Sequence, residues 1–432
     1  MKKNMKSSKD KMLIEVNEKP LVGQWIILAI QHVFAMFGAT ILVPILVNGI
    51  AGAEVLTIPV ALATSGIGTL IYILCTKGKS PVYLGSSFAF IVPLAVGFAA
   101  AGTGGIFPGI ICVGLVYIFV AIIIKFIGKE WLHKLLPSVV IGPMIMIIGL
   151  SLASSAIDQI GIVEGTNIEW QSLVVALVTF IATVISAVIA KGFIRVIPFL
   201  IGIAAGYVSA ICFGMVDFTA VKEASFFMIP NFILPFRDYA PNAKALISIV
   251  PIALVTICEH VGDHTALGSI IGKNLIKDPG LDRTLLGDGI ASIVAGALGG
   301  PANTTYGENT SVVGMTKVAS VWVIGLAAIF AILFSCMGML TEIFKTIPGP
   351  VLGAVSILLY GFIAVNGLKV LIENQVDFNK TKNVVVAATM LVLGLGGAAI
   401  TIASGNFELA ISGMTLAAIV GVILNLALPE NE

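Results

Sequence analysis

Charged residues are scarce in this sequence. Lys, Arg, Asp and Glu make up 11% of its 432 residues, whereas 58% are hydrophobic, and the mean hydropathy is +1.07. Soluble domains are nearer to a quarter charged, so the composition excludes an ordinary soluble protein and predicts a polytopic membrane protein surrounded by lipid. The net charge of +1, without a basic patch, gives no indication of nucleic acid as a partner.

Paired cysteines are also lacking. The five cysteines are scattered through apolar stretches, so we expect them to be packing residues rather than a disulfide framework or a metal site. The basic, polar residues 1–20 precede an apolar run from Leu21 to about Ile50, which is too long for a signal-peptide core. We therefore interpret residues 1–20 as a cytoplasmic tail that leads into a first membrane span.

Long apolar runs are what the chain has in abundance. Runs of roughly 17 to 25 residues are long enough to cross a bilayer as helices. We expect fourteen spans, at residues 22–48, 55–76, 81–100, 104–126, 134–158, 171–191, 195–215, 244–268, 282–300, 301–316, 318–340, 350–372, 382–402 and 409–428. With fourteen crossings, 20 of the 24 Lys and Arg residues fall on one side. Because positively charged loops stay in the cytoplasm, this predicts a cytoplasmic-membrane protein with both termini in the cytoplasm.

The third and tenth spans are short, and each begins with proline followed by small, hydroxyl and β-favouring residues: "PVYLGSSFAFIVP" (81–93) and "PANTTYGENTSVVG" (301–314). Their similar placement in the two halves of the chain predicts two seven-span repeats of inverted orientation. We expect an all-α protein in which these two spans each contain a short extended segment followed by a half-helix. Interrupted spans in inverted repeats indicate a transporter's binding site near the membrane midplane, where half-helix amides donate hydrogen bonds.

Three carboxylates, Glu259, Asp263 and Glu308, lie at membrane depth near these interruptions. Glu259 and Asp263 are four residues apart and share a helix face. Ionisable residues inside spans are functional by default, whereas we interpret His32 and His260 as packing residues. Burying a carboxylate is costly unless it is paired, hydrogen-bonded or protonated. Because no Lys or Arg is expected at this depth, we expect a proton or N–H groups of a ligand to offset this cost. Carboxylates accept hydrogen bonds and backbone amides donate them, so a planar base such as uracil fits such a site.

The sequence resembles the nucleobase–cation symporter family, which also includes the nucleobase–ascorbate transporters. The likeness extends over almost the whole chain, and its clearest motif is "ENTSVVGMTK" (308–317), in which Ser311 stands where the family usually has glycine. The glutamate at the first position is similar to the uracil-carrying branch, whereas purine and xanthine carriers typically have glutamine. The resemblance implies uracil import by proton symport with alternating access, and no cofactor beyond the coupling proton.

The resemblance also implies roles for particular residues. Glu259 and Glu308 would hold the base through their side chains, and Phe88 and Gly307 through backbone amides. The positions expected to flank the site are Ala39, Ser87, Tyr306 and Tyr360. The implied domains are a core (21–126 and 241–341) and a gate (127–240 and 342–432), and the implied assembly is a homodimer through the gate domain.

At the position linked to proton coupling the sequence departs from the family pattern, because Asp263, with His264 beside it, stands where uracil carriers of the family can have histidine. Asp263 and Glu259 should repel when both are ionised, so a proton shared between them would be a means of coupling. The alternative is that Asp263 merely orients Glu259 or bonds to backbone.

Other functions remain to be weighed against nucleobase import. A purine carrier of the same family, an anion carrier of the same inverted fold, and a channel are alternatives, although paired carboxylates oppose an anion site. An intramembrane aspartyl protease using Asp263 and Asp288 is disfavoured, because Leu285 replaces the glycine of the G-x-G-D form and Asp288 is expected near a span end.

Overall fold

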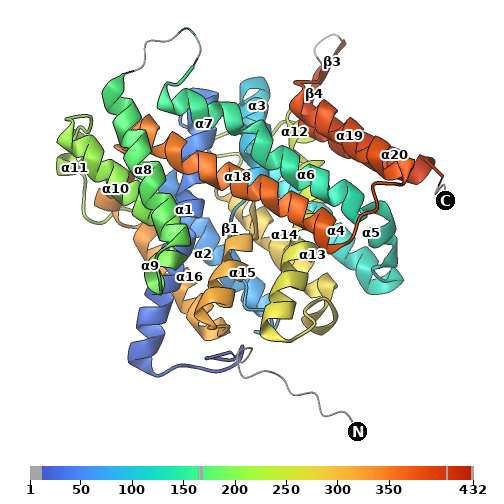
Figure 1. Ribbon diagram of the computed structural model, residues 1–432, viewed down its shortest axis with the longest axis horizontal. Coiled ribbons are helices and arrows are strands. Elements are labelled where there is room, and N and C mark those ends of the chain that lie inside the picture. The colour runs from blue at the N-terminus through green and yellow to red at the C-terminus, as the bar shows by residue number, and fades with distance from the viewer. Residues whose placement is uncertain (1–11, 164, 166–168, 405–406, 430–432) are drawn as a thin grey trace.

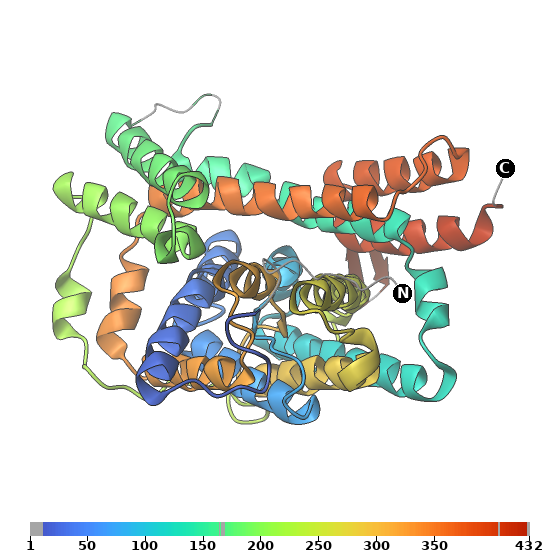
Figure 2. The same ribbon diagram turned by 60° about the horizontal axis from the view of Figure 1, so that its bottom comes forward.

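The computed structural model of the chain describes residues 12–163, 165, 169–404 and 407–429, and it is built mainly of helices (Figure 1). The helices lie in two bundles, which are separated most clearly in Figure 2. The first bundle comprises α1 (Val22–Ala51), α2 (Ile58–Cys75), α3 (Ile91–Ala101), α4 (Thr103–Ile127), α12 (Leu246–Ile249), α13 (Ile252–Ile271), α14 (Leu281–Ala297), α15 (Gly307–Thr316) and α16 (Val321–Ser335). The second comprises α6 (Ser138–Ser151), α7 (Ala153–Ile160), α8 (Trp170–Val188), α9 (Phe193–Val196), α10 (Pro198–Cys212), α18 (Gly349–Glu373), α19 (Thr381–Leu395) and α20 (Gly413–Ala427).

Short elements connect and interrupt these helices. They are the strands β1 (Leu84–Ser86), β2 (Asn303–Thr305), β3 (Ala399–Ser404) and β4 (Phe407–Ser412), the helical turns η1 (Phe88–Phe90) and η2 (Ile276–Gly280), and the helices α5 (Glu130–Leu135), α11 (Thr219–Glu223) and α17 (Gly338–Lys345). Helix α17 runs alongside the first bundle next to α11.

Several helices are built to face lipid. In the described chain, 7 helices are long and apolar enough to cross a membrane, and five shorter apolar helices accompany them. The side chains of Leu173, Leu177, Ile181 and Ile185 recur every four residues along α8 and are all more than a third exposed. An exposed apolar stripe of this length is typical of a helix that lies within a bilayer. The protein is therefore a multi-pass membrane protein, as the composition predicted.

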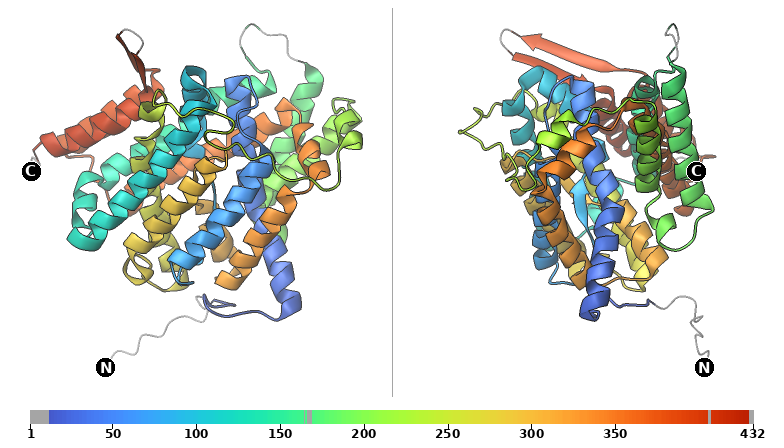
Figure 3. Two further views of the ribbon diagram at one scale, coloured as in Figure 1. Left: turned by 180° about the vertical axis from the view of Figure 1, so that it is seen from behind. Right: turned by 90° about the vertical axis from the view of Figure 1, so that its left-hand side faces the viewer.

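The first bundle has a symmetric arrangement of helices from the two halves of the chain. Helix α2 packs against α16, and α4 packs against α14, as seen from behind in Figure 3. Both contacts depend on glycine: a Cβ added at Gly66 would lie 2.4 Å from the carbonyl oxygen of Ala328, and one added at Gly114 would lie 2.4 Å from that of Gly289. Small residues let helix backbones approach in this way inside membranes.

Two short strands from opposite halves meet inside the first bundle. Strands β1 and β2 pair antiparallel, with Leu84 opposite Thr305 and Ser86 opposite Asn303. Side chains of the surrounding helices donate to two of the strand carbonyls: Ser65 Oγ donates to the Leu84 carbonyl at 2.7 Å, and Ser292 Oγ donates to the Asn303 carbonyl at 2.7 Å. This explains how extended backbone is tolerated at membrane depth.

Near the end of the chain, the helices are shorter than the predicted spans 382–402 and 409–428. Helix α19 ends at Leu395 and α20 begins at Gly413, and the antiparallel hairpin β3–β4 occupies the residues between them. The physical reason is the β-branched alternation of "AITIAS", with Ile400 and Ile402 two residues apart, a period that favours a strand. The prediction of an all-α chain, interrupted only in the third and tenth spans, was wrong at this point.

Candidate functional site

Each of the two paired strands is followed by a helix, and the N-termini of these two helices, η1 and α15, border the same cavity. After β1, the Ser87 N–H donates to the Ala302 carbonyl at 3.1 Å, and the chain turns at once into η1 and α3. After β2, the Tyr306 N–H donates to the Tyr83 carbonyl at 3.3 Å, and α15 begins at Gly307 with Glu308 in its first turn. Unpaired amides at helix N-termini and the helix dipole both favour an acceptor at this point.

A cavity of about 470 Å³ lies between the bundles at these N-termini. Its size is typical of a small-molecule site. Eight of the nine residues predicted for the site line it: Ala39, Ser87, Phe88, Glu259, Asp263, Tyr306, Gly307 and Glu308. They come from α1, η1 and its preceding residue, α13 and the β2–α15 junction, so the fold brings together residues that are far apart in sequence.

Tyr360, the ninth, does not line the cavity. The α18 residues on its wall are instead Leu359, Phe362, Ile363, Val365 and Asn366. Tyr360 is 2% exposed and its backbone carbonyl lies against Gly149 of α6, where an added Cβ would be 2.3 Å away. A residue next to Leu359 on a helix is rotated by about 100°, which turns Tyr360 towards α6 rather than towards the cavity.

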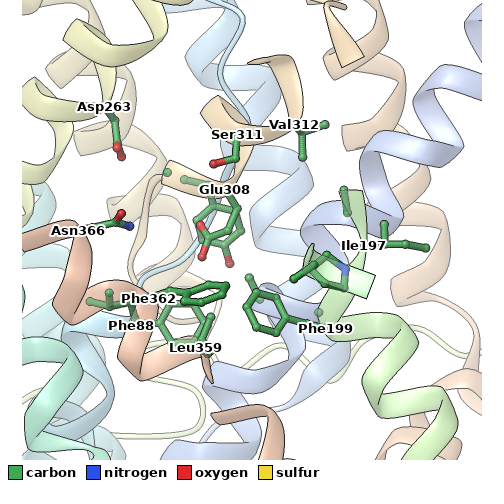
Figure 4. Close-up of a pocket in the computed structure, with 18 of the residues that line it drawn as sticks. Phe88, Ile197, Phe199, Asp263, Glu308, Ser311, Val312, Leu359, Phe362 and Asn366 are labelled. Atoms are coloured by element: carbon green, nitrogen blue, oxygen red, sulfur yellow. The ribbon is translucent and has the colours of Figure 1, made fainter. Parts of the chain in front are cut away.

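The carboxylates gather on the first-bundle side of the cavity. Figure 4 shows the side chains of Asp263 and Glu308 reaching into the space between the helices. Gly307 leaves room for the aspartate, because a Cβ added at Gly307 would lie 3.2 Å from Asp263 Oδ1. The other oxygen, Asp263 Oδ2, is buried and makes no hydrogen bond within the described chain. Asp263 Oδ2 is thus an acceptor at the cavity that is free to receive an N–H group.

Aromatic rings close the opposite end of the cavity. Phe88, Phe199 and Phe362 are drawn together below Glu308 in Figure 4, and they come from η1, α10 and α18 respectively. Aromatic faces stack on planar ligands, and their apolar surface keeps water from the acceptors. The site therefore combines hydrogen-bond acceptors, helix-terminal donors and a flat apolar wall.

Tyr306 ties the strand junction to α1. Its hydroxyl donates to the Ser86 carbonyl at 3.1 Å and lies 3.2 Å from Thr40 Oγ1. The ring rests directly on Gly85, where an added Cβ would be 2.3 Å from the ring carbon Cζ. Only glycine fits at this position in β1, so the two interrupted spans have a fixed separation.

The asparagine of the "ENTSVVGMTK" motif holds α15 to its neighbours. Asn309 Oδ1 lies 2.8 Å from His32 Nε2, and Asn309 Nδ2 donates to the Pro81 carbonyl at 3.0 Å. His32 on α1 therefore has a partner and a structural position, which agrees with its interpretation as a packing residue.

A second buried cluster, which the sequence did not reveal, lies behind β2. Asp288 is fully buried in the middle of α14, where its Oδ2 atom lies 2.9 Å from His260 Nδ1 and accepts from the Thr305 N–H at 3.1 Å. His260 Nε2 lies 2.9 Å from Thr284 Oγ1, and the rings of His260 and His264 stack at 4.0 Å. His260 is thus a paired packing residue, as predicted, whereas the expectation that Asp288 lies near a span end was wrong.

Two polar residues of the cavity also escaped the sequence analysis. Arg195 on α9 and Asn366 on α18 line it from the second bundle, so the cavity that holds the carboxylates also has one cation on its wall. Arg195 follows a predicted span and was counted with the loop charges, and nothing in the linear sequence shows that α9 turns inward to contact α15. Within the described residues no group of His, Cys, Asp and Glu is placed to hold a metal ion.

The fold defines a class of protein. Solved structures that share it include the transmembrane domain of a cyanobacterium bicarbonate transporter, BicA, with a TM-score of 0.62 at 13% identity, covering 94% of this chain and 99% of that one. The murine anion transporter Solute Carrier 26 family member A9 in its inward-facing state is another, with a TM-score of 0.63 at 14% identity, covering 94% of this chain and 68% of that one. At such identities the likeness concerns the fold alone: that of membrane transporters built from inverted repeats.

The sequence comparisons place the chain more narrowly. The family model described as "Permease family" matches residues 23–403. Relatives named uracil permease include those of Bacillus caldolyticus (47% identical, covering 97% of this chain and 95% of the relative), Bacillus subtilis strain 168 (46%, covering 98% and 97%) and Escherichia coli K12 (41%, covering 96% and 93%). The chain belongs to this permease family, the nucleobase–cation symporters that its motifs indicated, whose members are transporters rather than enzymes.

Proposed function

We propose that the protein imports uracil across the cytoplasmic membrane by proton symport with alternating access. The observation that carries the proposal is the name "uracil permease" on relatives 41–47% identical over nearly their whole length, together with a cavity lined by Glu259 and Glu308. The test is uptake of labelled uracil into proteoliposomes, competed by uracil, thymine, hypoxanthine and xanthine, with and without a protonophore. Stronger competition by a purine than by uracil would contradict the assignment of the substrate.

Recognition of the base follows from the chemistry of the lining. Uracil presents alternating N–H and C=O groups along one edge. We assign its N–H groups to Glu259 and Glu308, and its carbonyl oxygens to the amides of Phe88 and Gly307, with the Phe88 ring against its face. Ala39, Ser87 and Tyr306 complete the surface around the base.

An anion carrier is the second candidate, because both solved neighbours named above transport anions according to their descriptions. The cavity opposes it. Three carboxylates line the space against a single cation, Arg195, among the described residues, and an anionic ligand would be repelled. A protease using Asp263 and Asp288 is opposed as well, because the Asp288 carboxylate is engaged by His260 and Thr305 behind β2.

Asp263 is our candidate for proton coupling together with Glu259. Asp263→Asn is expected to retain uracil binding and counterflow exchange but to lose accumulation driven by a pH gradient, since an amide cannot take up the proton. The measurement compares counterflow with pH-driven uptake in proteoliposomes. Accumulation with the parent's pH dependence would make Asp263 a structural residue that orients Glu259, and would move the proton site to Glu259 or Glu308.

The membrane arrangement we propose has fourteen crossings with both termini in the cytoplasm, because only then do the Lys and Arg residues gather on one side. Single cysteines at Lys79, Lys129 and Lys277 in a cysteine-free background are expected to be labelled from the cytoplasmic side. Labelling of Lys79 and Lys129 from opposite faces would contradict the crossing of the segment that contains β1 and α3.

The division into moving parts follows the two bundles. We propose that the first bundle is the core domain that carries the base, and that the second is the gate domain, through which two copies would associate within the lipid. Cross-linking of single cysteines on the exposed face of α8 would test this association, and the absence of cross-linked dimers from that face would oppose it.

A further inference from the structure

Arg195 lies at the boundary between two cavities. It lines the 470 Å³ cavity that holds the carboxylates, and it also lines a second cavity of about 1100 Å³. The second cavity is bordered by the segment before α1, by the α8–α9 connection and by the end of α15. Helix α9 contacts α8 and α10 of its own bundle and α15 of the other, so Arg195 is anchored on the second bundle beside the helix that bears Glu308.

The two walls of the carboxylate cavity differ in chemistry. The first bundle supplies Glu259, Asp263 and Glu308, whereas the second supplies apolar side chains with the exception of Arg195 and Asn366. Among the described lining residues of this cavity, Arg195 is the one cation, on the wall opposite to the three carboxylates. It forms no ion pair with any of them in this structure, and its side chain is exposed to the cavities.

The other charged groups near Arg195 are placed differently. Lys19 is held over the rings of Trp25 and Trp322 at 4.5 and 5.3 Å, and the carboxylate of Glu18 accepts the Glu15 N–H at 3.1 Å. Lys191 borders the larger cavity and is not among the residues that line the carboxylate cavity. Asp288 and His260 face each other behind β2 and do not line the carboxylate cavity. Arg195 is thus the cation available to the carboxylates when the bundles move together.

An empty carrier presents a specific difficulty. When it reorients, the second bundle must close over ionised carboxylates, and burying such charges against an apolar wall is costly unless a counter-charge accompanies them. A loaded carrier avoids this, because a proton neutralises one carboxylate and the N–H groups of the base engage the others. Only the return step needs a cation from the opposite wall.

We propose that Arg195 is the counter-charge that allows the empty carrier to reorient, a further functional residue that acts on transport without binding the base. This inference rests on the proposed function of proton-coupled uracil import. It separates two transport modes that share the same binding site: net uptake requires the empty carrier to return, whereas counterflow exchange proceeds through the loaded carrier alone.

The test measures both modes in proteoliposomes containing the purified full-length protein and labelled uracil. Arg195→Gln removes the charge at similar length, and Arg195→Lys retains it. Lys191→Gln is the matched control, because Lys191 is four residues away in the α8–α9 connection and borders the larger cavity. Arg195→Gln is expected to lower net uptake about tenfold or more while counterflow stays within about twofold of the parent. Arg195→Lys and Lys191→Gln are expected to retain most of both activities.

The outcomes distinguish this inference from the proposed function. A parent protein without uracil counterflow would contradict the function itself. If the parent shows both modes, an equal fall of both in Arg195→Gln would make Arg195 a structural residue. Unchanged net uptake in that variant, or an equal loss in Lys191→Gln, would also overturn the assignment of the counter-charge to Arg195.

Discussion

Replacement of Glu308 by glutamine is expected to weaken uracil binding by about 10- to 150-fold. The reason is the loss of a charge-assisted hydrogen bond, worth about 1.5–3 kcal/mol, from a carboxylate that reaches into the cavity from the first turn of α15. The amide also introduces a donor into a site where the helix N-termini already donate. The measurement is the equilibrium affinity of the purified variant for uracil.

The same result is expected for Glu259→Gln, which removes the carboxylate contributed by α13. Glu373→Gln is a suitable control, because Glu373 is exposed at the end of α18 and pairs only with Lys369, one helical turn away. Thermal unfolding of all three variants in detergent establishes that they are folded. Affinity within threefold of the parent in both cavity variants would exclude these glutamates as ligands of the base.

Replacement of Asp288 by alanine is expected to weaken uracil binding, although Asp288 does not line the cavity. The change leaves the Thr305 N–H, at 3.1 Å, and His260 Nδ1, at 2.9 Å, without their buried partner. Leaving a buried hydrogen-bonding group without its partner costs about 1–3 kcal/mol. Since Thr305 ends β2 just before Tyr306 and Gly307, we expect lower stability and weaker uracil binding together.

The measurements for this cluster are the unfolding midpoint in detergent and the affinity for uracil. Asp288→Asn keeps an acceptor for the Thr305 N–H and provides a milder variant if alanine prevents folding. Asp377→Asn, in the exposed α18–α19 connection, is the control. An alanine variant with the parent's stability and affinity would show that β2 holds its position without Asp288.

The sequence alone was sufficient to predict most of the helices, the buried carboxylates and the two interrupted spans. The apolar runs marked the helices, and the carboxylates stood out because charge at membrane depth is rare. The pair of proline-led segments pointed to the place where Phe88 and Gly307 begin their half-helices. These signals are local, so the residues around the cavity could be named before their arrangement was known.

What sequence could not supply depends on packing between distant segments. Arg195 was indistinguishable from a loop cation, because its inward position results from α9 lying against α15. Asp288 is buried only because α14 runs behind β2, where His260 and Thr305 meet it. Tyr360 was expected at the cavity, but the rotation of α18 against Gly149 presents Leu359 and Phe362 there instead.

The pairing of β1 with β2 also bears on how the protein is made. Strand β1 is synthesised half a chain before the strand that completes it, since Leu84 faces Thr305. Until then, α2 can satisfy only part of β1, through Thr69 Oγ1, which accepts the Leu84 N–H at 2.9 Å, and Ser65 Oγ, which donates to the Leu84 carbonyl. The other exposed backbone groups have no partner in hydrocarbon. The first half of the chain therefore cannot complete the hydrogen bonding of β1 by itself, and the second half must be in place before the backbone of β1 is paired.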